Sequence, residues 1–264
     1  MLGISSGIVG KPTRFIGKRL SDIIFARMGH KKLIRFAEIK SFPNVMEYPE
    51  GRAGTWRNYF KNHNPITLEL ACGKGEYATG LAALHPDKNF IGIDVKGNRI
   101  WVGAKKALER NLKNVAFVRT QIDKLKDLFA GNEISEIWIT FPDPFLRVSK
   151  LKKRLTHPKF LRLYQSVLIP GGKIHLKTDS PDLYFFTKKV IELYSLRVND
   201  DLERLYDHEN ISPDLKIKTH YEGRNISKSD NVYYLCFSLP AEIPNKDEEL
   251  KKFFKEKMAE GTHG

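Results

Sequence analysis

The fold is decided by the stretch Ile66-Thr67-Leu68-Glu69-Leu70-Ala71-Cys72-Gly73-Lys74-Gly75. Its first half has the apolar pattern of a short strand, and its second half is a turn built from small residues. A helical pattern then runs over residues 77–84 and ends at Pro86. Small residues let the backbone approach a ligand, and the N-terminus of the following helix offers free N–H groups. The stretch therefore predicts a strand, turn and helix, the context that a nucleotide-binding Gly loop requires. A tight turn without a ligand is the alternative interpretation.

Strands and helices alternate along the rest of the chain. Further strands are expected at residues 90–94, 115–118, 136–140, 173–177, 195–198 and 232–239, and helices at residues 99–110, 125–129 and 183–194. This alternation predicts an α/β fold, in which a doubly wound, mostly parallel sheet is covered by helices on both faces. Such sheets bind ligands beyond the carboxyl ends of their strands, at the switch point of the topology.

The second strand ends in an acid, Asp94, twenty-five residues after Glu69. A carboxylate at this place can accept hydrogen bonds from both hydroxyls of a ribose. Together with the Gly loop, Asp94 therefore predicts a cofactor that contains a nucleoside. The loop resembles the E-x-G-x-G-x-G pattern by which class I methyltransferases bind S-adenosylmethionine (SAM), with Ala71 at the first glycine position. The extra methyl group of Ala71 is expected to be tolerated.

The chain is basic, with a formal net charge of +14, and the charge is patterned. Residues 146–162 contain no acid and seven basic residues: Arg147, Lys150, Lys152, Lys153, Arg154, Lys159 and Arg162. A concentrated positive segment favours a polyanionic partner such as nucleic acid. The two cysteines and eight histidines show no metal-ligand spacing, and no apolar run approaches the ~20 residues of a membrane span. We therefore expect no metal and no membrane.

An unusual loop, Phe141-Pro142-Asp143-Pro144-Phe145, follows the fourth strand and leads into the basic segment. The two prolines hold Asp143 in a stiff, extended backbone. A structural turn is the alternative interpretation. The loop continues without a gap into Leu146-Arg147-Val148-Ser149-Lys150-Leu151-Lys152-Lys153-Arg154-Leu155.

This run resembles the signature F-P-D-P-W-P-K-K-R-H-x-K-R-R-L of bacterial tRNA (guanine-N7-)-methyltransferases. Two later motifs of that family also have counterparts, Lys177-Thr178-Asp179 and Thr219-His220-Tyr221-Glu222. The resemblance covers about residues 56–239. It implies a Rossmann-like class I methyltransferase fold, with a seven-stranded sheet whose last strand is antiparallel. Its substrates would be SAM and tRNA, with the variable-loop guanosine as the target.

The resemblance also assigns residues. Asp143 would be the catalytic residue, an active-site carboxylate. The SAM-binding residues would be Glu69, Gly73, Gly75, Asp94, Gln121 and Asp143. Residues binding the target nucleotide would be Arg147, Asp179, Thr219, His220, Tyr221 and Glu222, with Asp179 and Glu222 as candidates to read guanine N1–H and N2–H. We expect Lys150, Lys152, Lys153 and Arg154 to contact tRNA phosphates.

The chain departs from the family at two places. The family's Pro-Lys-Lys-Arg is Leu146-Arg147-Val148-Ser149 here, and its acid after the third strand is Gln121. Gln121 can hydrogen-bond an adenine through its amide, but Asp123 is a rival. Two other functions stay open. Asp143-Pro144-Phe145 loosely resembles the loop of N6-adenine methyltransferases, and the chain could also be a non-catalytic RNA-binding subunit with a SAM fold.

We expect three regions: a basic arm and lead-in at residues 1–55, a methyltransferase domain at 56–240, and a surface helix and tail at 241–264. Residues 1–27 are interpreted as a dispensable arm in preference to a targeting signal, with Met28 as a possible second start. A cytoplasmic location is expected. The sequence leaves open whether the protein is a monomer or a homodimer.

Overall fold

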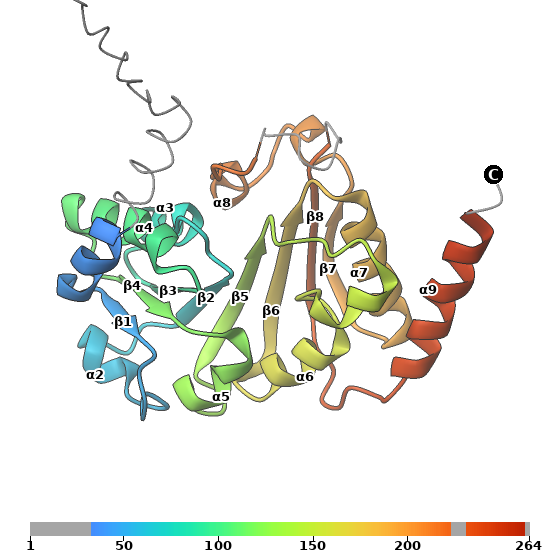
Figure 1. Ribbon diagram of the computed structural model, residues 1–264, viewed down its shortest axis with the longest axis horizontal. Helices are drawn as coiled ribbons and strands as arrows, with labels where there is room; N and C mark the ends of the chain where they lie inside the picture. Colours follow the sequence, from blue (N-terminus) through green and yellow to red (C-terminus); the bar gives the residue numbers. More distant parts are fainter. Residues whose placement is uncertain (1–32, 223–230, 262–264) are drawn as a thin grey trace, which may run out of the picture.

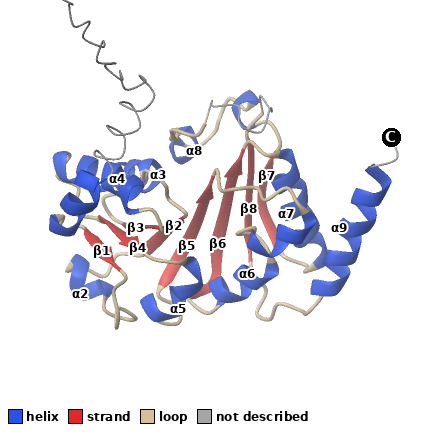
Figure 2. Cartoon of the chain, in the orientation of Figure 1, coloured by secondary structure: helices blue, strands red, loops and turns tan. Residues whose placement is uncertain are grey.

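The computed structural model describes residues 33–222 and 231–261, so the expected arm at residues 1–27 and Met28 lie outside the described residues. Within them, one mostly parallel sheet runs through the molecule with helices on both of its faces (Figures 1 and 2). The predicted α/β fold is confirmed. No described helix combines the length and apolar character needed to cross a membrane.

The described sheet has eight strands in the order β1-β4-β3-β2-β5-β6-β8-β7. They are β1 (Val45–Glu47), β2 (Ile66–Leu70), β3 (Asn89–Asp94), β4 (Val115–Arg119), β5 (Ile134–Thr140), β6 (Leu168–Thr178), β7 (Arg197–Leu202) and β8 (Tyr233–Ser238). The expected number, seven, is one too low, because β1 adds a short parallel strand beside β4. β8 pairs antiparallel with both β6 and β7, as expected of the last strand.

One helical layer packs on each face of the sheet. One face is covered by α2 (Trp56–Phe60), α5 (Leu125–Leu128), α6 (Pro158–Gln165), α7 (Pro181–Leu193) and α9 (Asp247–Gly261). The other face is covered by α3 (Glu76–Leu84), α4 (Gly97–Glu109) and α8 (Pro213–Lys216). Short 3₁₀ turns complete the description: η1 (Ile39–Ser41), η2 (Ile122–Lys124), η3 (Val148–Lys153) and η4 (Leu205–Asp207). The central strands β2 and β3 are buried along their whole length, as parallel strands covered on both faces must be.

The ends of the sheet differ from the sequence-based expectation. β1 belongs to the lead-in that was expected to precede the domain, so the sheet draws a strand from before Trp56. β7 begins later than expected because Ser195, with φ of 53°, closes the turn after α7 in the left-handed region. At the C-terminus, Asp247 of α9 accepts two hydrogen bonds from the Arg162 guanidinium, at 2.7 and 3.0 Å, which fix the helix to α6.

The topology reverses between β2 and β5. From β2 the chain proceeds outward through β3 and β4, whereas β5 and β6 extend the sheet in the opposite direction. The carboxyl ends of β2 and β5 are therefore the switch point, where doubly wound folds bind their ligands. The Gly loop follows β2 and the Asp143 loop follows β5.

Candidate active site

The loop after β2 is held in a conformation that ordinary residues adopt only at a cost. Ala71, Gly73 and Gly75 all have positive φ, at 54°, 55° and 64°. For the two glycines this conformation is free of steric cost, but for Ala71 it costs about 1–2 kcal/mol. The methyl group of Ala71 is thus accommodated with strain. A side chain at Gly75 would place its Cβ 2.3 Å from the ring of Phe117, so close packing against the sheet also requires glycine there.

Asp94 shapes the Gly loop. Its two carboxylate oxygens accept hydrogen bonds from the main-chain N–H groups of Gly73, at 2.9 Å, and Lys96, at 2.8 Å. A carboxylate has about four acceptor positions, so two remain for ribose hydroxyls. A Cβ on Gly73 would lie 3.2 Å from the Tyr221 ring. The bare backbone, the adjacent aromatic ring and the terminal acid of β3 fit a nucleoside cofactor.

Glu69, expected among the SAM-binding residues, makes its hydrogen bonds within the protein. Its side chain is buried, and its carboxylate accepts hydrogen bonds from the Ala78 main-chain N–H at 2.8 Å and the Thr140 hydroxyl at 2.9 Å. Burial raises the pKa of Glu69 to about 8, although both hydrogen bonds oppose the shift. Glu69 therefore connects the first turn of α3 to the end of β5, and these contacts hold the two ends between which the Gly loop lies.

After β4, Gln121 and Asp123 take different positions. Gln121 is exposed and lines a hollow of about 470 Å³ together with Tyr48, Gly51 and Leu128. Asp123 forms an ion pair with Lys159 of α6, with 2.5 Å between Oδ1 and Nζ. The Asp123 carboxylate is therefore paired with α6, whereas the exposed Gln121 side chain lines the hollow.

The Asp143 loop starts at the carboxyl end of β5 and is strained on both sides of the acid. Phe141 and Phe145 adopt φ of 46° and 43°, a region that bulky side chains rarely occupy. Asp143 is exposed, and its Oδ1 accepts the Phe145 main-chain N–H at 3.0 Å, which closes an Asx turn. Arg147 follows as an exposed residue at the start of η3.

The basic segment is divided by its packing. Lys150, Lys152 and Lys153 are exposed on η3. Arg154, expected to contact a phosphate, is buried with 3% of its surface exposed, and this expectation is wrong. Its guanidinium donates hydrogen bonds to the carbonyl oxygens of Pro144 at 2.8 Å and Phe145 at 3.3 Å, so it stabilises the Asp143 loop.

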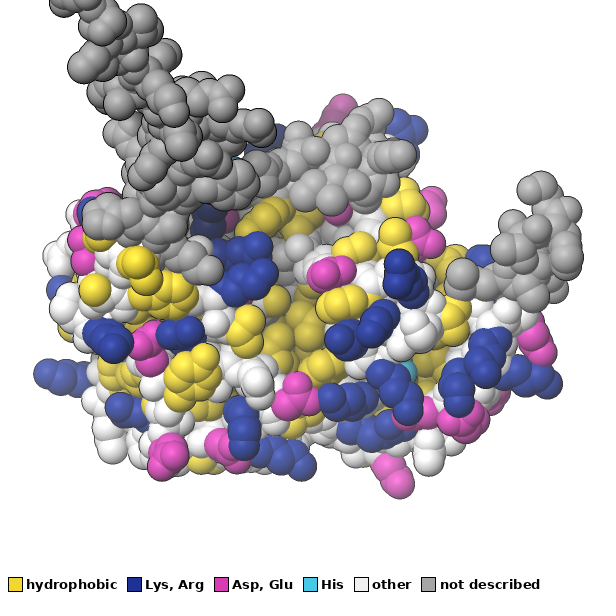
Figure 3. Space-filling model, viewed as in Figure 1, with side chains coloured by type: hydrophobic (Ala, Val, Ile, Leu, Met, Phe, Trp, Pro, Cys, Tyr) yellow, Lys and Arg dark blue, Asp and Glu magenta, His cyan; other side chains and the backbone are white. Residues whose placement is uncertain are grey.

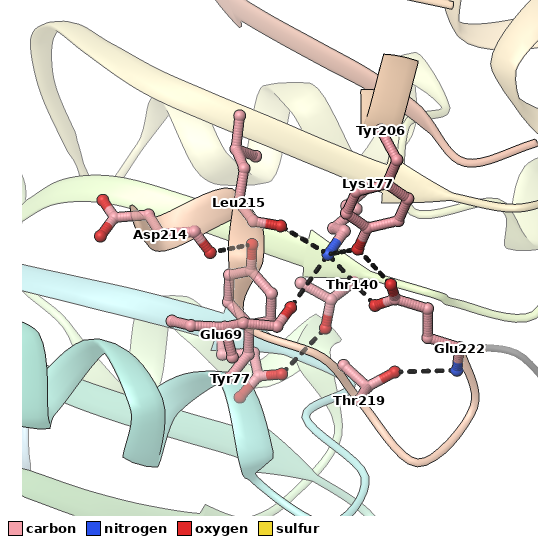
Figure 4. Close-up of polar contacts among 10 residues, drawn as sticks. Glu69, Tyr77, Thr140, Lys177, Tyr206, Asp214, Leu215, Thr219 and Glu222 are labelled. Atoms are coloured by element: carbon pink, nitrogen blue, oxygen red, sulfur yellow. Dashed lines mark hydrogen bonds and ion pairs between the residues drawn. The ribbon is translucent and has the colours of Figure 1, made fainter. Parts of the chain in front are cut away.

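The remaining predicted residues also lie at the carboxyl edge of the sheet. Asp179 is half-buried just after β6, and Thr219 and Tyr221 are half-buried in the segment after α8, where His220 is exposed and the side chain of Glu222 is buried. Tyr221 lies beside Gly73, and the guanidinium of Arg99 from α4 stands 5.4 Å from its ring centroid. The Glu222 carboxylate contacts Lys177 and Tyr206 (Figure 4).

Sequence reasoning assigned no role to Lys177 and Tyr206. The available signal was a lysine at the end of an otherwise apolar strand, where a cation needs partners if it is buried. Nothing in the local sequence marks Tyr206. Among residues 33–222 and 231–261, no three or more His, Cys, Asp or Glu side chains gather as a possible metal site.

Solved structures with a similar fold are methyltransferases that share little sequence with this chain. The 16S rRNA methyltransferase KamB superposes with a TM-score of 0.54 at 16% identity, covering 70% of this chain and 93% of that one. A 30S ribosomal methyltransferase from an uncultured bacterium gives a TM-score of 0.53 at 16% identity, covering 70% and 92%. At this level of identity the similarity concerns the fold.

Sequence comparison is more specific. The family described as "Putative methyltransferase" matches residues 63–235. The tRNA (guanine-N(7)-)-methyltransferase of Bacteroides thetaiotaomicron is 44% identical over 224 residues, covering 81% of this chain and 88% of the relative. The protein of the same name from Porphyromonas gingivalis is 45% identical over 213 residues, covering 76% and 86%. The site geometry, the fold and these matches lead to one conclusion: the chain belongs to the tRNA (guanine-N7-)-methyltransferase family of class I methyltransferases.

Proposed function

We propose that this protein transfers the methyl group of SAM to N7 of a guanosine in tRNA, and that the target is the variable-loop guanosine. The observation that carries the proposal is the position of Asp143. It is an exposed carboxylate on a strained loop at the switch point, with the Gly loop on one side and three exposed lysines of η3 on the other. The names of the relatives support the same reaction. Such a tRNA substrate implies a cytoplasmic location.

SAM would be held by the main chain around Gly73 and Gly75, by Asp94 at the ribose and by Gln121 at the adenine. When bound, SAM supplies an electrophilic methyl group on a sulfonium. Glu69 would contribute through the loop that it fixes. Tyr221, beside Gly73, would lie between the cofactor and the target nucleotide.

Guanine N7 already presents a lone pair in the plane of the ring, so no side chain has to remove a proton. The task of the site is to align N7 with the methyl group and to stabilise a purine that becomes cationic. Asp143 can do both, because its exposed carboxylate is held by the Asx turn and offsets the growing charge. Asp179, Arg147 and residues Thr219, His220 and Tyr221 would hold the nucleotide.

A direct assay tests the proposal. Unmodified tRNA is incubated with the protein and SAM, digested, and its modified base is mapped by mass spectrometry. We expect 7-methylguanosine in the variable loop. Methylated adenosine would indicate the N6-adenine reaction instead, and unmodified tRNA together with saturable SAM binding in calorimetry would contradict the assigned substrate. A non-catalytic subunit that had lost its cofactor site would show no saturable heat with SAM.

A further inference from the structure

A fully buried lysine, Lys177, contacts both the Asp143 loop and the segment that carries Tyr221 and Glu222. Lys177 is the last residue but one of β6, and none of its side chain is exposed. Its Nζ lies within hydrogen-bonding distance of four acceptors (Figure 4). They are the carbonyl oxygens of Leu215 and Ile217, both at 2.9 Å, the Tyr206 hydroxyl at 3.0 Å, and Glu222 Oε2 at 3.1 Å.

The main chain of Lys177 makes a second connection. Its carbonyl oxygen accepts the N–H of Phe141 at 2.8 Å, at the first residue of the Asp143 loop. The ring centroids of Phe141 and Tyr77 lie 5.7 and 5.5 Å from Nζ. One residue thus contacts the loop that carries the catalytic acid and the segment that carries Tyr221.

Glu222 is committed to this arrangement. One carboxylate oxygen is 3.1 Å from Lys177 Nζ, and the other accepts the hydroxyl of Tyr206. Only 5% of the Glu222 side chain is exposed. Burial lowers the pKa of Lys177, and the charge and hydrogen bond of Glu222 oppose that shift. If Glu222 turned to bind a guanine edge, it would leave a buried ammonium without its counter-ion, which is strongly unfavourable.

We propose that Lys177, Glu222 and Tyr206 form a positioning network that fixes the segment 213–222 relative to Asp143, and that Glu222 does not read the guanine edge. The readout of N1–H and N2–H then falls to Asp179, the half-buried carboxylate two residues after Lys177. Glu222 acts on the substrate through the segment that it anchors, including its neighbour Tyr221. The assignment of guanine as substrate rests on the proposed function, whereas the network itself rests on the contacts alone.

The kinetic test separates positioning from reading. Two tRNA substrates are compared, one with guanosine at the target position and one with inosine, which lacks the N2 amino group. We expect Lys177→Met to lower kcat/KM at least tenfold and Glu222→Gln to lower it at least threefold. For each variant, the loss should be the same with the guanosine and the inosine substrate. Asp179→Asn should instead reduce the preference for guanosine over inosine. The matched control is Lys173→Met, which removes an exposed lysine from the same strand and should leave both rates unchanged. A guanosine preference that falls with Glu222→Gln would overturn the proposal.

A second measurement does not depend on activity. Amide hydrogen exchange, followed by mass spectrometry, should be faster at residues 205–222 in Lys177→Met and Glu222→Gln, with β2, β3 and β4 unchanged. Unchanged exchange at 205–222 would contradict the network even in an active enzyme. If the wild-type protein methylates no tRNA, the proposed function fails, and the exchange result still decides whether the network holds the segment.

Discussion

At the scale of single residues, strain surrounds Asp143. Phe141 and Phe145 occupy the left-handed region on either side of it, and each such residue costs about 1–3 kcal/mol. Strain of this kind persists only where surrounding contacts enforce it, and it gathers at functional sites. The Phe141 N–H on Lys177 and the carbonyl oxygens held by Arg154 supply those contacts.

The first prediction concerns the charge of Asp143. Asp143→Asn retains the oxygen that accepts the Phe145 N–H and removes only the negative charge. We expect kcat for tRNA methylation to fall by a factor on the order of 10², the scale of losing one electrostatic contact to a transition state. SAM affinity in calorimetry and the melting temperature should stay close to wild type. Turnover near the wild-type rate would exclude a catalytic role for the Asp143 carboxylate.

The second prediction concerns Glu69 and pH. The folded-state pKa of Glu69 is raised to about 8 from 4.5, mainly by burial. The native state therefore binds more protons than the unfolded state between pH 4.5 and about 8, and stability falls as pH rises through that window. Glu69→Gln carries no ionisable group and should flatten this decline. Urea unfolding without SAM at pH 5 and pH 8.5 measures the difference.

The matched control for this experiment is Glu249→Gln, which changes an exposed glutamate on α9. It should keep the wild-type dependence of unfolding free energy on pH. A Glu69→Gln protein whose stability declines with pH as steeply as the wild type would show that Glu69 ionises normally in the fold.

At the scale of elements, the sequence predicted most strands and helices within a few residues, but it missed α6, and β6 begins five residues before the predicted strand 173–177. The predicted helix 77–84 is α3 (Glu76–Leu84), and the predicted strand 90–94 is β3 (Asn89–Asp94). These elements are specified by local apolar patterns, which the sheet then buries on both faces. β1 could not be predicted in the same way, because Val45–Glu47 is too short to show a period and forms only by pairing with β4.

The same distinction between local sequence and tertiary contacts applies to the residues of the site. Asp94 and the Gly loop follow directly from a strand, turn and helix, so the spacing in the sequence was enough to find them. The partners of Lys177 come from residues 206, 215, 217 and 222, which the fold alone brings together. Arg154 was misassigned for the same reason, since its burial depends on Phe186 of α7, whose ring centroid is 4.6 Å from the guanidinium carbon.

The third prediction concerns Arg154 as a support of the Asp143 loop. Arg154→Met removes the donors to the Pro144 and Phe145 carbonyl oxygens. We expect the free energy of unfolding to fall by about 1–3 kcal/mol, the cost of leaving buried polar groups unpaired. We also expect kcat to fall while the salt dependence of tRNA binding stays unchanged. Lys153→Met, at the exposed neighbouring position, is the control and should retain wild-type stability. If tRNA binding by Arg154→Met depended less steeply on salt than binding by the wild type, Arg154 would contact a phosphate after all.

At the scale of the whole molecule, basic side chains gather on part of the surface (Figure 3). The carboxyl edge of the sheet carries the Gly loop and the acids Asp94, Asp143 and Asp179. Lys and Arg side chains gather on the part of the face where α6 and α9 lie (Figure 3). With a net charge of +14, the protein attracts polyanions over its surface, but a defined tRNA pose requires a cluster beside the acid loop. η3 follows that loop directly and supplies such a cluster.

The last prediction tests whether η3 holds the RNA. If Lys150, Lys152 and Lys153 contact phosphates, they release counterions when tRNA binds, and affinity falls steeply with salt. Replacing all three by alanine should raise KM for tRNA and reduce the log–log salt slope by about 2–3, at about 0.7–0.9 per contact. SAM affinity should stay constant, because none of the three lies on the Gly loop. The control replaces Lys105, Lys106 and Lys113, which are also exposed but belong to α4 and the turn after it, in the opposite helical layer. Both triple variants lose the same net charge, so a general electrostatic attraction would lower their slopes equally. Only a larger change in the η3 variant, measured by tRNA binding at four salt concentrations, supports a phosphate-binding surface beside Asp143.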